Sequence, residues 1–289
     1  MTTLFTILFD GAAYGMLLFV ISCGLAVTLG LMNFVNLAHG AFAMAGGYVC
    51  AVLVNKLGWP FAAGLPMAFL ASAAIGIVLE RLLYRHLYDR PHLDQVLFTV
   101  GLVFMAVTVA DYIMGSSQTF IKLPDALQGQ INLFGVGIGR YRLMIIVICG
   151  LLTVGLQLIL ARTRFGSRLR AAVDDPRAAS GLGINVPYVF ALTFAFGCGL
   201  AGFGGALGAE ILGLDPYFPL KFMIYFLIVV TVGGASSMTG PFLASLLLGV
   251  ADVAGKYYVP KLGAFVIYTL MIVILLWRPN GLFGRVATR

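Results

Sequence analysis

Charged residues are scarce in this sequence, and their scarcity excludes a water-soluble globular protein. Of the 289 residues only 10% are charged, whereas 61% are hydrophobic, and the mean hydropathy is +1.02. Soluble domains are on average about one quarter charged and about half apolar. A chain so poor in charge needs a hydrocarbon solvent around it. The composition predicts a polytopic membrane protein, and because no soluble domain or linker is evident we expect a single domain over 1–289.

Groupings of reactive side chains are missing as well. The four cysteines lie in apolar runs with no Cys-x-x-Cys pair, and the three histidines are scattered. No paired carboxylates and no Ser/His/Asp set can be placed on one membrane face. The segment nearest to a nucleotide-binding loop, 249–257, has one residue too many before Gly255-Lys256 and continues with Tyr257. We therefore expect no metal site and no catalytic site, and any ATP hydrolysis to belong to another subunit.

Acidic residues are almost absent from the apolar segments, with Asp111 and Asp252 as exceptions. Both fall near the outer ends of their segments, which favours placement at a helix end over an ion relay. A proton-coupled carrier normally needs a carboxylate near the membrane centre, and none is evident. An ion-driven secondary transporter stays an alternative because carbonyls of broken helices can hold sodium.

Long apolar stretches indicate where the chain crosses the membrane. Residues 1–10 contain no Lys or Arg, so the basic region of a cleavable signal peptide is missing and we expect the first segment to be retained. A crossing takes roughly 20 apolar residues. The predicted segments are 11–30, 35–55, 57–79, 95–115, 141–161, 187–209, 222–235, 240–255 and 262–277. They give nine crossings, or eight if one short segment is re-entrant, and 222–255 is split at its Gly/Pro-rich turn.

Basic residues predict the orientation of the chain. The net charge is +7, and eleven of the 18 Lys and Arg residues lie in three clusters. The clusters are Arg81/Arg85/Arg90, Arg162/Arg164/Arg168/Arg170/Arg177 and Arg278/Arg285/Arg289. Such residues concentrate on cytoplasmic flanks, and two and then four predicted segments separate the clusters. We expect all three clusters and the C-terminus in the cytoplasm, the N-terminus outside, and the longest outer loop at 116–140.

The segment 33–48 carries the densest polar signal inside the apolar region. It holds Asn33, Asn36 and His39 together with Gly40, Gly46 and Gly47. Unwound backbone at membrane depth survives only where protein buries it or where it lines a cavity. The segment therefore indicates either a discontinuous helix that faces a pathway or polar caps that hydrogen-bond between helices at the cytoplasmic interface.

A second signal lies in the cytoplasmic loop 162–187. Asp175 can cap and Pro176 can begin a short helix, and Gly181 or Gly183 can end it. A plain basic loop needs no such alternation of cap, helix and glycine stop. The pattern favours a structured segment that docks a partner.

These motifs together resemble the branched-chain amino acid ABC transporter permeases. The resemblance is carried by 33–40 (Asn-Phe-Val-Asn-Leu-Ala-His-Gly), 44–48 (Met-Ala-Gly-Gly-Tyr) and the loop 168–184. It continues through 99–102 (Thr-Val-Gly-Leu), 233–234 (Gly-Gly), 239–241 (Thr-Gly-Pro) and 277–284 (Trp-Arg-Pro-Asn-Gly-Leu-Phe-Gly). The length and the Asn-Phe/Ala-His-Gly segment are similar to the shorter of the two paired permeases.

The resemblance implies an all-α permease with some discontinuous helices. It would pair with a second homologous permease and with two cytoplasmic ATP-binding subunits, which bind the ATP and Mg. Substrate would come from a periplasmic or lipid-anchored binding protein, and the chain would lie in the bacterial cytoplasmic (inner) membrane. Residues 168–184 would be the segment that contacts an ATPase, with Arg177-Ala178-Ala179 where other importers have Glu-Ala-Ala. The implied coupling residues are Arg168, Arg170, Asp174, Asp175, Arg177, Ala178, Ala179 and Gly183.

We expect import of branched-chain or related hydrophobic amino acids by alternating access, because a pathway without fixed charges suits a zwitterion with an apolar side chain. Urea, short amides and aromatic acids are the alternative substrates within the superfamily. The expected pathway or gate residues are Asn33, Asn36, His39, Gly40, Met44, Gly46, Gly47, Thr99, Gly233 and Gly234.

Overall fold

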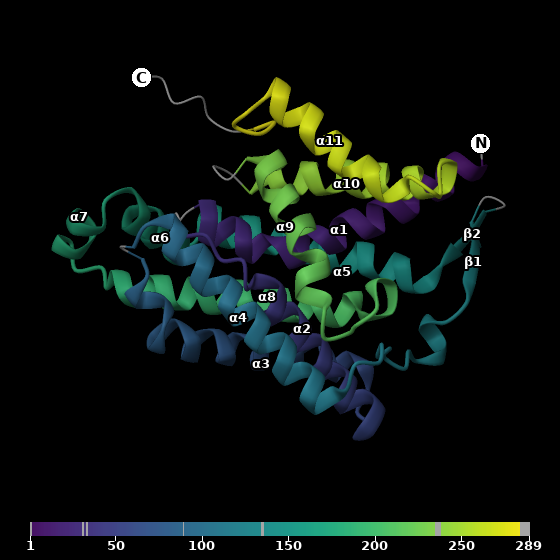
Figure 1. Cartoon of the computed structure of the whole chain (residues 1–289), viewed down its shortest axis with the longest axis horizontal. Coiled ribbons are helices and arrows are strands. Elements are labelled where there is room, and N and C mark those ends of the chain that lie inside the picture. Colours follow the sequence, from purple (N-terminus) through teal and green to yellow (C-terminus); the bar gives the residue numbers. More distant parts are fainter. Residues whose placement is uncertain are drawn as a thin grey trace.

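The computed structural model describes residues 2–30, 32, 34–88, 90–133, 136–234 and 238–283, and most of them are helical (Figure 1). The long helices are α1 (Thr2–Gly30), α3 (Phe61–Leu82), α4 (His92–Met114), α5 (Arg140–Arg162), α8 (Val186–Leu212) and α10 (Thr239–Tyr258). The shorter ones are α2 (His39–Ala51), which continues as a π-helix (Val52–Lys56), α6 (Arg164–Asp174), α7 (Pro176–Gly181), α9 (Phe218–Gly233) and α11 (Gly263–Trp277). Single 3-10 turns occupy Tyr84–His86 and Asp125–Leu127.

The helices run back and forth along the long axis of the molecule, which gives the bundle two distinct ends (Figure 1). The hairpin end carries the N-terminus and the strands β1 (Gln130–Leu133) and β2 (Val136–Gly139), and the opposite end carries α6 and α7. Two helices, α4 and α5, separate the first two basic clusters, and four, α8 to α11, separate the second from Arg278. The helix order thus agrees with the two and four segments predicted between the clusters, and the described parts of these clusters lie at the α6–α7 end. Arg285 and Arg289 lie outside the described residues.

Two local features differ from the sequence prediction. The first helix begins at Thr2 rather than at residue 11. The predicted segment starts after Asp10 because it was chosen free of charged residues, but a charged side chain does not end a helix, and Asp10 lies within α1 and forms an ion pair with Arg142 of α5. The loop 116–140 also contains the antiparallel hairpin β1–β2, with Ile131 opposite Ile138. Its strands are only four residues long, too short for a clear alternating pattern.

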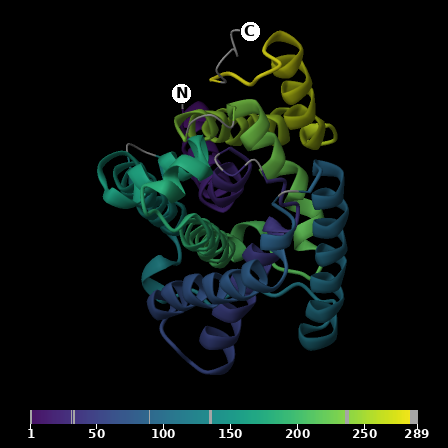
Figure 2. The same ribbon diagram turned by 90° about the vertical axis from the view of Figure 1, so that its left-hand side faces the viewer.

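Close helix packing forms the core around α1 and α8. In the view along the long axis these two helices lie inside the bundle, between α3 and α11 (Figure 2). A Cβ on Gly46 of α2 would lie 2.3 Å from the Cα of Gly202 in α8. Glycine at both positions therefore lets the two backbones approach, as is typical of helices packed within a membrane.

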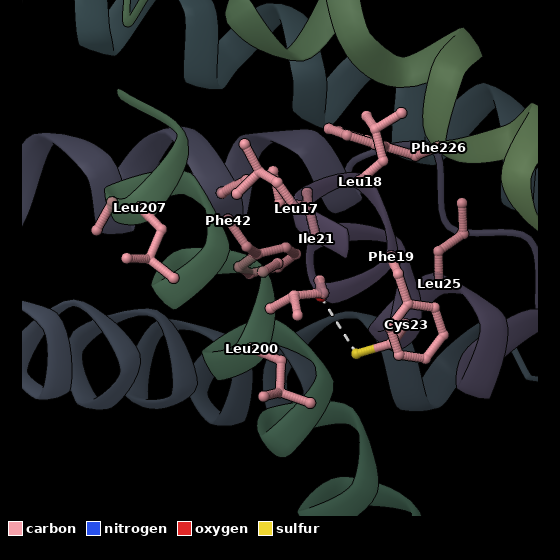
Figure 3. Packing of buried hydrophobic residues seen from close by; sticks show 14 of the residues in the cluster. Leu17, Leu18, Phe19, Ile21, Cys23, Leu25, Phe42, Leu200, Leu207 and Phe226 are labelled. Atoms are coloured by element: carbon pink, nitrogen blue, oxygen red, sulfur yellow. Dashed lines mark hydrogen bonds between the residues drawn. The ribbon is translucent and has the colours of Figure 1, made fainter. Parts of the chain in front are cut away.

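Large apolar side chains fill the space beside these glycine contacts. Figure 3 shows Leu17 and Ile21 of α1 beside Phe42 of α2 and Leu200 and Leu207 of α8. All five are at most 5% exposed. Among the described residues five helices, α1, α3, α4, α5 and α8, are long and apolar enough to cross a membrane, and α9 and most of α11 are shorter apolar helices. The chain is thus an all-α polytopic membrane protein, and its β1–β2 hairpin lies in a connecting loop.

Candidate functional site

The polar segment after α1 forms a break between two helices. α1 ends at Gly30 and α2 begins at His39, and residues 34–36 have no regular secondary structure. Asn33 lies outside the described residues. The break places irregular backbone inside the bundle, where each N–H and C=O group needs a partner from the protein.

Side chains of α4 supply two of those partners. The backbone N–H of Val35 donates to Oε1 of Gln95 at 3.0 Å, and the N–H of Leu37 donates to Oγ1 of Thr99 at 3.3 Å. Gln95 is 2% exposed and Thr99 is fully buried. Because residues four apart share one face of a helix, both side chains reach the break from the same side of α4. Thr99 was predicted from the resemblance, whereas Gln95 was not, although its polar side chain in an apolar segment was a usable signal.

Asn36 organises the break from within. Its Oδ1 accepts hydrogen bonds from the N–H of Ala38 and from the hydroxyl of Tyr84, both at 3.1 Å. The side chain is fully buried, and its Nδ2 has no hydrogen-bond partner in the described part of the chain. A buried amide with spare donor capacity costs free energy. Asn36 is therefore costly to keep in this conformation.

His39 fixes the start of α2 against the middle of α1. Its Nε2 lies 2.7 Å from the carbonyl oxygen of Ile21, and the side chain is 2% exposed. A carbonyl only accepts, so Nε2 carries the proton and donates. Asn36, His39 and Thr99 are thus brought together at the break.

An aromatic cluster covers the break at the α6–α7 end. The ring of Phe34 meets those of Tyr84 and Tyr88 edge-on, each at a centroid distance of 5.5 Å. The Tyr88 hydroxyl donates to Oε1 of Glu80 at 3.0 Å. Burial, and secondly the nearby Glu80 carboxylate, raise the pKa of Tyr88 well above its ordinary value. The hydroxyl therefore remains a donor at every physiological pH.

The other predicted pathway residues on α2 lie in packed interior. Gly40 faces Pro219 of α9, and a Cβ there would lie 3.0 Å from its Cα. Gly47 faces the side chain of Leu214, and Met44 is 3% exposed. Together with Gly46 these residues seat α2 between α8 and α9 in this conformation.

Gly233 and Gly234 end α9, and the C-terminal motif covers them. The N–H groups of Leu282 and Phe283 donate to the carbonyls of Val232 and Gly233 at 2.8 and 3.3 Å. Gly234 has φ +84°, which favours glycine. Leu282 and Phe283 of the C-terminal motif thus satisfy carbonyls that the last turn of α9 leaves without helical partners. This long-range contact has no local signal in the sequence.

The loop 162–187 folds into two helices. Asp175 Oδ1 accepts from the N–H groups of Arg177 and Ala178 at 2.9 and 3.0 Å, and Pro176 is the first residue of α7. Gly183 follows with φ +82°. The predicted cap, start and glycine stop are confirmed. α6 was not predicted, although Thr163 caps it by accepting from the N–H of Gly166.

Most of the predicted coupling residues are exposed on α6 and α7. The exposed ones are Arg168, Arg170, Asp174, Asp175, Arg177, Ala178 and Gly183. Ala179 is 2% exposed. Ala179 packs in a small core with Leu169, Ala172, Val186 and Val189, which fastens α7 to α6 and α8. Arg170 also donates to the carbonyl of Leu160 in α5.

Comparison with known proteins gives the same family over nearly the whole chain. The family model for the branched-chain amino acid transport system permease component matches residues 7–275. The chain is 28% identical to LivH of Escherichia coli strain K12, a high-affinity branched-chain amino acid transport system permease protein, over 96% of this chain and 94% of LivH. BraD of Pseudomonas aeruginosa, a permease protein of the same description, is 29% identical over 96% of this chain and 95% of BraD.

A longer permease protein matches as well. LivM of Salmonella typhimurium is 27% identical over 94% of this chain and 69% of LivM, so the chain has the length of the LivH type. No solved structure gives a significant match. The chain belongs to the family of branched-chain amino acid transport system permease components.

Proposed function

We propose that this chain is the membrane permease of an ATP-driven importer and carries branched-chain amino acids into the cytoplasm by alternating access. It pairs with a second homologous permease, and two cytoplasmic subunits bind ATP and Mg and hydrolyse the ATP. A periplasmic or lipid-anchored binding protein delivers the substrate to the bacterial inner membrane. The matches to both LivH and LivM support a pair of related permeases.

The observation that carries the proposal is the position of α6 and α7 in a chain of this family. Both helices extend beyond the bundle at the end where the described arginines of the three clusters lie (Figure 1). Basic flanks mark the cytoplasmic side, so this end faces the cytoplasm and the N-terminus and hairpin face outside. The exposed residues of α6 and α7 then meet the ATP-binding subunits.

Force applied to α7 reaches the membrane helices through its buried contacts. The core around Ala179 includes Val186 and Val189 at the start of α8, and Arg170 holds α6 against the end of α5. A displacement of α7 therefore moves α5 and α8 with it. α8 also packs along α1, α2 and α3, so the movement spreads through the bundle.

The break before α2 is the element that responds to such a movement. The N–H groups of Val35 and Leu37 bond to two side chains of α4, and Nδ2 of Asn36 has no partner among the described residues. Two arrangements of this segment relative to α4 would give the two states that alternating access requires.

The test is purification of the tagged chain in mild detergent. Co-purification of an ATPase and a second permease is expected, together with ATP hydrolysis that a leucine-loaded binding protein stimulates. A chain that purifies without an ATPase, and whose uptake follows an ion gradient, would refute the proposal.

A charge reversal tests the coupling surface. Arg177→Glu places a carboxylate on the exposed face of α7, and we expect it to lower uptake about tenfold or more while the chain still folds. Lys122→Glu is the matched control, because Lys122 is exposed at the hairpin end. Equal uptake in the two variants would contradict a docking role for α7.

A further inference from the structure

The hairpin end of the bundle contains a cavity of about 410 Å³. α1, α5, α8, α9 and α10 all contribute to its walls. Its volume falls within the roughly 300–1,000 Å³ of small-molecule sites. It shares no lining residue with the break before α2, so it is a separate feature.

Charged groups of both signs surround the cavity. Its charged lining consists of Asp10, Arg142, Lys221, Asp252 and Lys256. Ion pairs join Asp10 to Arg142, Asp215 to Lys221 and Asp252 to Lys256. With Asp215, which pairs with Lys221 but does not line the cavity, three carboxylates balance three cations, so the group as a whole is neutral. Such a set complements a solute that carries both signs better than it complements an anion or a cation.

The two signs differ in depth. The side chains of Arg142, Lys221 and Lys256 are 43–56% exposed, whereas that of Asp252 is 1% exposed. Oδ2 of Asp252 accepts from Lys256, and Oδ1 has no partner among the described residues. A carboxylate oxygen that is buried without a donor is costly. Oδ1 has no accessible surface in this conformation, so an entering ammonium group would supply the missing donor once the Asp252 side chain turns toward the cavity.

The remaining wall is apolar and aromatic. It consists of Ala13, Tyr14, Ile211, Leu212, Phe222, Tyr225 and Val253. The Lys256 Nζ lies 5.5 Å from the centre of the Tyr14 ring, so the aromatic wall adjoins the charged one. A branched aliphatic side chain would bury apolar surface there.

We propose that this cavity is the outer binding site for a zwitterionic α-amino acid with an apolar side chain. The inference rests on the proposed function, because it takes the hairpin end to face outside. The substrate ammonium donates to Oδ1 of Asp252. The substrate carboxylate accepts from Arg142, whose pair with Asp10 engages Nη1 and leaves further guanidinium donors. The side chain lies against Tyr14 and Phe222.

Direct binding to the full-length chain in lipid nanodiscs, measured by calorimetry, tests the site. The probes are leucine, isocaproate, which lacks the ammonium, and isoamylamine, which lacks the carboxylate. We expect each analogue to bind about tenfold or more weakly than leucine, because each loses one charge-assisted interaction. Analogues that bind as well as leucine, or no binding of leucine at all, would overturn the proposal.

Two variants assign the charges. Arg142→Gln should weaken the binding of leucine about tenfold or more and leave the binding of isoamylamine unchanged. Asp252→Asn should weaken the binding of leucine and of isoamylamine and leave that of isocaproate unchanged. Asp111→Asn is the matched control, since Asp111 accepts from Ser116 at the end of α4 and does not line the cavity. If Asp252→Asn does not fold, the Arg142→Gln variant still tests the proposed site, because the side chain of Arg142 is half-exposed. Leucine affinity unchanged in Arg142→Gln refutes the assignment.

Uptake in cells separates this inference from the proposed function. A chain that supports ATP-driven leucine uptake but does not bind leucine in nanodiscs would refute the site alone. A chain that binds leucine through Arg142 but never associates with an ATPase would refute the importer and leave the site standing.

Discussion

Replacement of Gln95 by alanine removes the side chain that holds the break before α2 against α4. In the native chain Oε1 accepts from the N–H of Val35 at 3.0 Å, and Nε2 donates to the carbonyls of Leu87 and Arg90 at 3.2 and 3.1 Å. One side chain thus bonds to three backbone groups, one in the break and two in the turn before α4. The variant leaves these backbone groups without that partner.

The loss can be estimated from these contacts. A buried donor left without a partner costs about 1–3 kcal/mol, and a net hydrogen bond contributes about 0.5–1.5 kcal/mol. The N–H of Val35 belongs to the first kind, since Gln95 is 2% exposed. The two carbonyls lie where the chain enters α4, and each of them loses one net hydrogen bond. The free energy of unfolding should therefore fall by about 2–6 kcal/mol.

The assay is reversible unfolding of the purified chain in mixed micelles. Gln128→Ala is the matched control, because Gln128 is exposed and its Nε2 makes one surface hydrogen bond, to the carbonyl of Leu123 at 2.8 Å. Its loss should stay within about 0.5 kcal/mol. Equal losses in the two variants would refute the role of Gln95 in supporting the break.

Three further substitutions follow from the packing. Gly46→Ala should destabilise the chain by about 2 kcal/mol or more in the same assay, because the new Cβ would lie 2.3 Å from the Cα of Gly202. Gly150→Ala in α5 should be neutral or stabilising, since nothing lies within 4 Å of its Cβ position, and a loss there as large as at Gly46 would contradict this packing argument. Asp175→Ala should lower the stability of α7 by about 1 kcal/mol and speed hydrogen exchange at the N–H groups of Arg177 and Ala178, because it removes their acceptor. Unchanged exchange would show that tertiary packing alone holds α7.

Local patterns determined the helical segments and their direction. Apolar length and the Gly/Pro breaks indicated where helices begin and end, and the arginine clusters indicated which ends lie together. α7 was predictable in detail because a capping residue, a proline and a glycine act within ten residues of chain. The motifs in 33–48 and 168–184 also indicated the family. All these signals depend on neighbours in sequence.

Only the tertiary structure decided which polar side chains meet. Gln95 and Val35 are 60 residues apart in sequence, and His39 meets a carbonyl of α1. Asp10 of α1 pairs with Arg142 of α5, and Asp252 lies beside a cavity that five helices form. Burial and pairing of a charge depend on which helices pack together, and composition does not fix that choice. The sequence by itself determined a helical permease with its basic ends on one side, whereas long-range packing decided its break and its charged cavity.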